Sequence, residues 1–165
     1  MTEHGTLRRD GERRAVSFER VYEARPEELW RSLTTPEQLG GWLAEVVRWE
    51  LEENGAFELR FGAEDTERAS GRVRRLEEGR LLELDWQFPG EPQSLVRFEV
   101  RPHERGAVLA LEHVLLDAES APAYSAGWHA HLDRLAAHLR GDTVDWLARY
   151  QELRPSYDEQ ASALS

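Results

Sequence analysis

Apolar and polar positions divide this chain into a strand-rich middle and a helical end. Between residues 47 and 115, apolar residues alternate with polar ones in short runs separated by turns, which is the pattern of half-buried strands. Farther along, the period lengthens, and the apolar residues of one helical face recur at i, i+4, i+7 and i+11: Trp128, Leu132, Leu135 and Leu139. A single helix of this kind must pack across a sheet to bury that face.

The order of the elements predicts an α+β fold built on an antiparallel meander. A first strand is expected over residues 16–22, and two short helices begin at Pro26 and Pro36. The Gly40-Gly41 pair is expected to end the second helix. Six further strands are expected around residues 47–51, 57–61, 68–76, 82–88, 96–100 and 107–115. A curved sheet that grips the closing helix leaves room for a cavity between the two.

The length of 165 residues indicates one domain with two short tails. Residues 1–14 are polar and predict a flexible arm, residues 15–141 carry the periodic pattern of the domain, and residues 142–165 form a helical tail. The sequence contains no run of about 18 apolar residues, and its N-terminus lacks the apolar core of a signal peptide. We therefore expect no membrane span and a cytoplasmic location.

A second helix is expected in the tail. Asp142 or Thr143 is predicted to cap it, Pro155 is predicted to end it, and the last ten residues are expected to fray. The helix carries an apolar stripe that is too large to leave in water: Trp146, Leu147, Tyr150 and Leu153. This stripe either folds back on the domain as a lid or brace, or docks on a second subunit in a homodimer.

Charge and composition limit the kinds of partner and chemistry that we expect. The chain has 32 acidic and 21 basic residues, a formal net charge of −11, and Arg as its only basic residue apart from His. A nucleic-acid partner is not expected, because phosphate contacts need a basic surface. The absence of Cys excludes disulfides and thiolate chemistry, and the absence of Lys excludes a Schiff base on this chain.

Two motifs support a family resemblance. The first is the run Thr34–Glu37, which leads to Trp42, and the second is the run Gly127–Leu135 on the closing helix. With the order of elements, these motifs resemble the START-like (SRPBCC) superfamily over residues 15–140. More narrowly, they resemble the bacterial branch related to the activator of the heat-shock-ninety ATPase.

The resemblance implies a helix-grip fold, in which the antiparallel sheet curls around the C-terminal helix and the two short helices lie behind one end. It also implies a hydrophobic cavity. The superfamily includes lipid carriers, polyketide cyclases, plant hormone receptors and co-chaperone domains, so the fold does not determine the function. Leu43 departs from the pattern, because relatives often carry a second Trp beside the position of Trp42.

His113 is the polar residue most open to a functional role. Strand alternation places it on the same side as Leu109, Leu111 and Leu115, which we expect to face the helix near Tyr124 or His131. A neutral imidazole in an apolar cleft could orient a ligand or act as a general base. The alternative is a core histidine whose hydrogen bonds are satisfied internally.

Aromatic residues are expected to form most of the pocket wall, although any one of them could equally belong to the core. The candidate ligand-binding residues are drawn from the strands, the second short helix and the closing helix: Trp42, Phe57, Phe61, Trp86, Phe98, His113, Tyr124, Trp128 and His131.

Other site chemistries find little support. His129 and His131 point to different sides of a helix, and His131 and His138 are two turns apart, so we expect no metal site. No Gly-x-Ser-x-Gly elbow or glycine-rich phosphate loop is present, and we expect no catalytic residues and no cofactor.

These observations favour a protein that binds a small hydrophobic or amphipathic molecule in an interior cavity, without strong catalysis. One alternative is a cyclase or dehydratase in which His113 or His131 moves protons. The other is a co-chaperone-like interaction module whose contacts lie on residues 143–165 or the acidic surface. The sequence does not identify the ligand.

Overall fold

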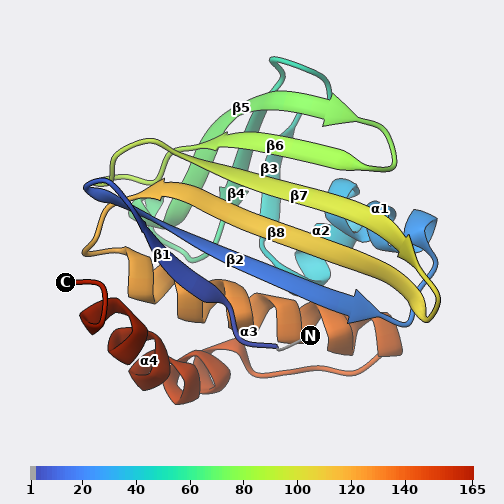
Figure 1. Cartoon of the computed structure of the whole chain (residues 1–165). Helices are drawn as coiled ribbons and strands as arrows, with labels where there is room; N and C mark the ends of the chain where they lie inside the picture. Colours follow the sequence, from blue (N-terminus) through green and yellow to red (C-terminus); the bar gives the residue numbers. More distant parts are fainter. Residues whose placement is uncertain (1–2) are drawn as a thin grey trace.

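An eight-stranded antiparallel sheet is the framework of the computed structural model, which describes residues 3–165 (Figure 1). Along the chain the strands are β1 (Thr6–Asp10), β2 (Arg13–Tyr22), β3 (Glu45–Trp49), β4 (Ala56–Arg60), β5 (Arg68–Glu77), β6 (Leu81–Trp86), β7 (Ser94–His103) and β8 (Gly106–Leu116). In the sheet they follow the order β1-β2-β8-β7-β6-β5-β4-β3. All neighbours except β2 and β8 are consecutive along the chain, which confirms the predicted meander.

Helices connect some of the strands and follow the last one. Two short ones, α1 (Pro26–Thr34) and α2 (Pro36–Trp42), link β2 to β3, and a single 3₁₀ turn, η1 (Asp65–Glu67), precedes β5. The long helix α3 (Ala121–Arg140) crosses the concave face of the sheet, and α4 (Trp146–Ser162) packs on α3 from the side away from the sheet (Figure 1). The α+β helix-grip prediction is therefore confirmed.

The apolar face of α3 forms the centre of the core. Trp128, Leu132 and Leu135 are at most 4 % exposed and belong to one cluster with the inward residues of the sheet. Gly141 ends the helix in the left-handed conformation (φ 79°), which a residue without a Cβ adopts at little cost. Tyr22 on β2 also points inward, and its hydroxyl donates to the carbonyl of Leu132 at 3.1 Å.

The two halves of strand β5 pair with different neighbouring strands. The first half of β5 pairs with β4, from Arg68 to Arg72, and the second half pairs with β6, from Val73 onward. At this transition Gly71 lies so close to the neighbouring backbone that a Cβ on it would stand 1.9 Å from the carbonyl oxygen of Asp85. Only glycine permits this close approach.

The N-terminal segment is not the flexible arm that the sequence suggested for residues 1–14. Thr6–Asp10 form the edge strand β1, which pairs with β2, and Leu7 is buried. The segment is fixed because α4 covers it: the backbone N–H of Gly5 donates to the hydroxyl of Tyr157 at 2.7 Å. The part of the prediction that concerns residues 1–2 lies outside the described residues.

The structure corrects the predicted ends of α2 and α4, the predicted cap of α4 and the predicted orientation of Leu115 in the sheet. Helix α2 continues through Gly40-Gly41 to Trp42, and α4 continues through Pro155 to Ser162 because the buried Leu153 and Tyr157 hold it on both sides. The α4 cap is Asp145, whose carboxylate accepts from two backbone N–H groups, instead of residue 142 or 143. Leu115 is 42 % exposed with φ 64°, because a bulge in β8 reverses the alternation after His113.

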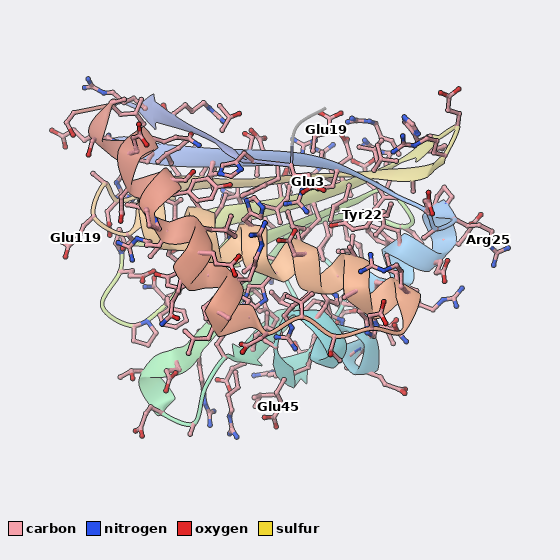
Figure 2. The ribbon with its side chains drawn as sticks, turned by 90° about the horizontal axis from the view of Figure 1, so that it is seen from below. Glu3, Glu19, Tyr22, Arg25, Glu45 and Glu119 are labelled. Atoms are coloured by element: carbon pink, nitrogen blue, oxygen red, sulfur yellow. The ribbon has the colours of Figure 1, made fainter. Side chains whose placement is uncertain are left out.

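Charged side chains occupy the outer surface. Glu19, Glu45 and Glu119 are exposed and project from the periphery of the molecule in the view of Figure 2. Several outward acids on the sheet pair with arginines, as Glu99 does with Arg80 at 2.8 Å. Within residues 3–165, no helix has the length and apolar character needed to cross a membrane.

Replacing Gly71 tests the close approach between β5 and β6. We expect Gly71→Ala to lower the free energy of unfolding by about 1–3 kcal/mol, because the added Cβ forces the Asp85 backbone to move. Urea denaturation followed by circular dichroism measures this change. The control is Gly40→Ala on exposed α2, where no atom lies within 4 Å of the added Cβ and the substitution should stabilise by up to about 1 kcal/mol. Equal effects of both substitutions would contradict this account.

Candidate ligand-binding cavity

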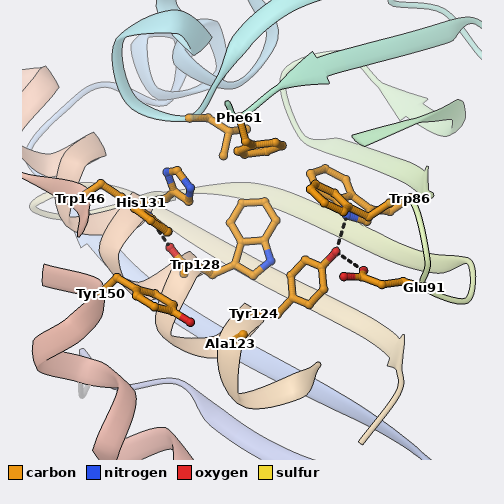
Figure 3. A pocket seen from close by; sticks show the side chains of 12 residues that line it. Phe61, Trp86, Glu91, Ala123, Tyr124, Trp128, His131, Trp146 and Tyr150 are labelled. Carbon is orange, nitrogen blue, oxygen red and sulfur yellow. Dashed lines mark hydrogen bonds between the residues drawn. The ribbon is translucent and has the colours of Figure 1, made fainter. Parts of the chain in front are cut away.

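Side chains leave a partly enclosed cavity of about 250 Å³ between α3, α4 and the far half of the sheet (Figure 3). Its wall combines residues from α2–β3, β4–β5, β6, the β6–β7 loop and both long helices: Leu43, Phe61, Trp86, Phe88, Glu91, Ala123, Tyr124, Gly127, Trp128, His131, Trp146 and Tyr150. The exposed wall is mostly apolar, as is usual for a small-molecule site.

Aromatic rings make up most of this wall. The Trp86 ring lies 5.8 Å from that of Trp128 and 6.0 Å from that of Phe61, centroid to centroid. On the opposite side, Trp146 and Tyr150 of α4 stack on each other at 5.0 Å with an interplanar angle of 17°. These ring contacts support one another across the wall.

His131 contributes an uncommitted hydrogen-bond acceptor to the wall. Its side chain is 8 % exposed, and Nδ1 lies 3.0 Å from the carbonyl oxygen of Trp42, to which it must donate. Burial lowers the pKa of His131 to about 4, so the ring is neutral near pH 7 and Nε2 carries a lone pair. Among residues 3–165, no hydrogen-bond donor faces Nε2.

A chain of hydrogen bonds crosses the other end of the cavity. The indole N–H of Trp86 donates to the hydroxyl of Tyr124 at 3.2 Å, and that hydroxyl donates to Oε1 of Glu91 at 2.5 Å (Figure 3). Burial raises the pKa of Glu91, and burial together with the Glu91 hydrogen bond raises that of Tyr124. The Tyr124 hydroxyl is therefore fully engaged, whereas the second oxygen of Glu91 is not.

His113 lies beneath the cavity and does not line it. Trp128 Nε1 donates to His113 Nδ1 at 2.9 Å, so the proton of the neutral ring is on Nε2, which donates to Ser94 Oγ at 2.7 Å. Burial lowers the pKa of His113 to about 3. Because both nitrogens have partners inside the protein, His113 holds Trp128 in place instead of meeting a ligand.

Three other predicted wall residues also lie in the packed interior. Trp42, Phe57 and Phe98 are at most 3 % exposed and do not reach the cavity. Trp42 donates its indole N–H to the carbonyl of Ser32, and Phe98 supports Trp128 edge-on at 5.9 Å. The structure thus brings five of the nine predicted residues together at the cavity: Phe61, Trp86, Tyr124, Trp128 and His131.

The candidate binding residues from the sequence did not include Trp146, Tyr150 or Glu91, although the tail was considered as a lid. The apolar stripe on α4 was a usable signal, since Trp146 and Tyr150 belong to it, although Leu147 on the same helix is 55 % exposed. Glu91 gave no signal, because a single acid in a Pro-Gly loop resembles many surface acids. The described residues contain no cluster of three His, Asp or Glu side chains able to hold a metal ion.

A partly buried ion cluster joins α4 to α3 beside the cavity. Asp133 on α3 accepts from Arg20 at 3.0 Å and from Arg149 on α4 at 2.7 Å. On the same side, the hydroxyl of Tyr157 on α4 lies 2.8 Å from Nδ1 of His129, whose pKa burial lowers to about 4. Polar groups at this level of burial need such partners, and the shared carboxylate joins β2, α3 and α4.

The curved sheet, the gripping helix and the apolar cavity between them define the class of START-like helix-grip proteins. Within this class, the chain belongs to the family of activator of Hsp90 ATPase homolog 1-like proteins, whose family model matches residues 23–140. A comparison with curated proteins finds no match.

Solved structures agree with this assignment. The crystal structure of CalU16 from Micromonospora echinospora is 28 % identical, with a TM-score of 0.81 over 96 % of this chain and 97 % of that one. Protein BPP1335 from Bordetella parapertussis is 27 % identical, with a TM-score of 0.71 over 92 % and 87 %. A conserved protein from Enterococcus faecalis, EF2215, shares the fold at 20 % identity, with a TM-score of 0.81 over 98 % and 92 %.

The neutral state of His113 predicts a pH dependence of stability. Its pKa is depressed in the folded protein, so between pH 6.5 and 4 the unfolded chain binds more protons and folding weakens as the pH falls. Between pH 6.5 and 5, this residue alone accounts for about 2 kcal/mol. The depressed pKa values of His129 and His131 add to the same slope, so we expect His113→Gln to reduce, but not abolish, the slope of unfolding free energy against pH, measured by urea denaturation.

Ser94→Ala is the matched control for this measurement. It removes the hydroxyl that accepts from His113 but leaves the imidazole able to titrate. We therefore expect Ser94→Ala to lower stability at every pH while keeping the slope. A slope unchanged in His113→Gln would show that other groups cause the acid sensitivity.

Proposed function

We propose that this protein binds a small hydrophobic or amphipathic molecule in the cavity between α3, α4 and the sheet. The observation that carries this proposal is an aromatic-lined hollow of about 250 Å³ that the side chains of a well-packed core leave unfilled. For comparison, an engineered apolar cavity of about 150 Å³ holds benzene. Membership in the activator of Hsp90 ATPase homolog 1-like family is consistent with binding in such a cavity.

Catalysis finds less support than binding. A cyclase or dehydratase mechanism through His113 requires a nitrogen free to exchange protons with a substrate, and both nitrogens of His113 are engaged by Trp128 and Ser94. His131 reaches the cavity, but burial favours its neutral form and Nδ1 is committed to a carbonyl. These features suit a residue that orients a ligand.

The tail is better explained as part of the binding site than as a docking surface. Trp146 and Tyr150 point into the cavity, and Leu153 and Tyr157 are buried against the rest of the chain. Little of the stripe then remains for a second subunit or a co-chaperone partner. A lid built from α4 is consistent with the ligand-binding proposal, because α4 closes one side of the hollow.

Filling the cavity tests the proposal. Gly127 lies in α3 on the cavity wall, and an added Cβ would meet only Trp146, at 3.7 Å. We expect Gly127→Leu to weaken binding of N-phenyl-1-naphthylamine, a neutral dye that fluoresces in apolar surroundings, by about tenfold or more, because the side chain occupies the dye's space. Dye titration followed by fluorescence measures this loss.

Gly127→Ala is the matched control, since its methyl group fits at van der Waals distance and improves the helix. It should bind the dye as the unchanged protein does. Ala123→Leu, one turn earlier on the same wall, provides a second filling variant in case Gly127→Leu does not fold. If the unchanged protein does not bind the dye, or folded filling variants bind it equally well, the proposal fails.

A further inference from the structure

We propose that the ligand is a neutral aromatic compound carrying a hydroxyl group, which donates a hydrogen bond to Nε2 of His131. This inference rests on the proposed function and adds the chemical class of the ligand. Three observations carry it: a hydrogen-bond acceptor without a protein partner on a buried side chain, a cavity wall without a cation, and a wall made mostly of aromatic rings.

Nε2 of His131 is the hydrogen-bond acceptor that would recognise the ligand. His131 is more than nine-tenths buried, and its ring packs at 5.2 Å from Trp146 and 5.9 Å from Phe61 as part of the cavity wall (Figure 3). The carbonyl of Trp42 determines the tautomer, so Nε2 can only accept. Covering an acceptor without giving it a donor is unfavourable, so an apolar ligand over Nε2 would bind at a cost. A ligand hydroxyl would supply the missing hydrogen bond.

The electrostatics of the wall exclude an anion. None of the described residues that line the cavity is an arginine, and the chain contains no lysine. On the opposite side of Trp128 from His131 the wall presents the carboxyl group of Glu91 (Figure 3). A carboxylate or phosphate in this hollow would meet acceptors at both ends and no cationic side chain on the wall, which is unfavourable in an apolar site. Both ends instead suit hydrogen-bond donors.

The aromatic rings of the wall favour an aromatic ligand. Trp128 and Trp86 lie on one side, and the stacked pair of Trp146 and Tyr150 lies on another, so a planar ring system can contact several ring faces or edges at once. The volume of about 250 Å³ exceeds the roughly 150 Å³ that suffices for benzene, so a two-ring compound is a suitable probe.

Three two-ring probes separate the contributions of shape, hydroxyl and charge. Equilibrium dialysis at pH 7.5 gives the dissociation constants of naphthalene, 2-naphthol and 2-naphthoate for the unchanged protein. We expect 2-naphthol to bind about fivefold more tightly than naphthalene, the value of one net hydrogen bond. We expect 2-naphthoate to bind at least about tenfold more weakly than 2-naphthol, because its charge has no partner.

His131→Phe keeps a ring in place and removes the acceptor. It should reduce the preference for 2-naphthol over naphthalene to less than about twofold, with naphthalene binding itself little changed. His103→Phe is the matched control, because it makes the same exchange on β7 at a residue that does not line the cavity, and it should keep the preference. If His131→Phe does not fold, the ranking of the three probes by the unchanged protein still decides.

The outcomes distinguish this inference from the function on which it rests. Equal binding of naphthalene and 2-naphthol, or tighter binding of 2-naphthoate, would overturn the ligand class while ligand binding itself stands. A preference that survives in folded His131→Phe would overturn the role of His131. If none of the probes binds, both the inference and the proposed function are wrong.

Discussion

The constraint on which this structure depends is that α3 is covered on two sides. Its apolar face, with Leu132 and Leu135, packs on the concave sheet, and its other side is covered by α4. The buried polar side chains of α3 therefore rely on partners within the protein. Asp133 meets this requirement by accepting from Arg20 and Arg149, and these bonds position α4.

Three buried histidines illustrate how partners determine a residue's role. His113 has both nitrogens engaged and acts as a support for Trp128. His129 faces Tyr157 of α4 and belongs to the interface between the helices. His131 has one nitrogen on a backbone carbonyl and the other without a partner among the described residues, beside a hollow. Burial makes all three neutral, and Nε2 of His129 also lacks a hydrogen-bond partner, so position beside the cavity, not charge, separates the two structural histidines from the one suited to a ligand.

Sequence periodicity was sufficient to predict the strands and helices but not to predict which residues line the cavity. Alternation in the strands and the 3.6-residue period of α3 reflect burial on one face, so the meander and the gripping helix could be predicted. Strand alternation places Phe57 on β4 and Phe61, just after β4, on the same side of the sheet. Only Phe61 reaches the cavity, because this depends on how the sheet curves. The continuation of α4 past Pro155 depends on tertiary contacts at Tyr157, which local propensity does not contain.

Part of the cavity wall lies outside the region that the family shares, so inferences about ligands do not pass directly from one relative to another. The family match ends at residue 140, whereas Trp146 and Tyr150, which close one side of the cavity, lie beyond it. The alignment with CalU16 covers 96 % of this chain and so extends well past the family match, but other family members need not carry an equivalent of α4. A relative without this helix would present the same sheet and the same α3 around a more open hollow. The proposed ligand preference therefore depends on the tail and the loop that carries Glu91, as much as on the shared fold.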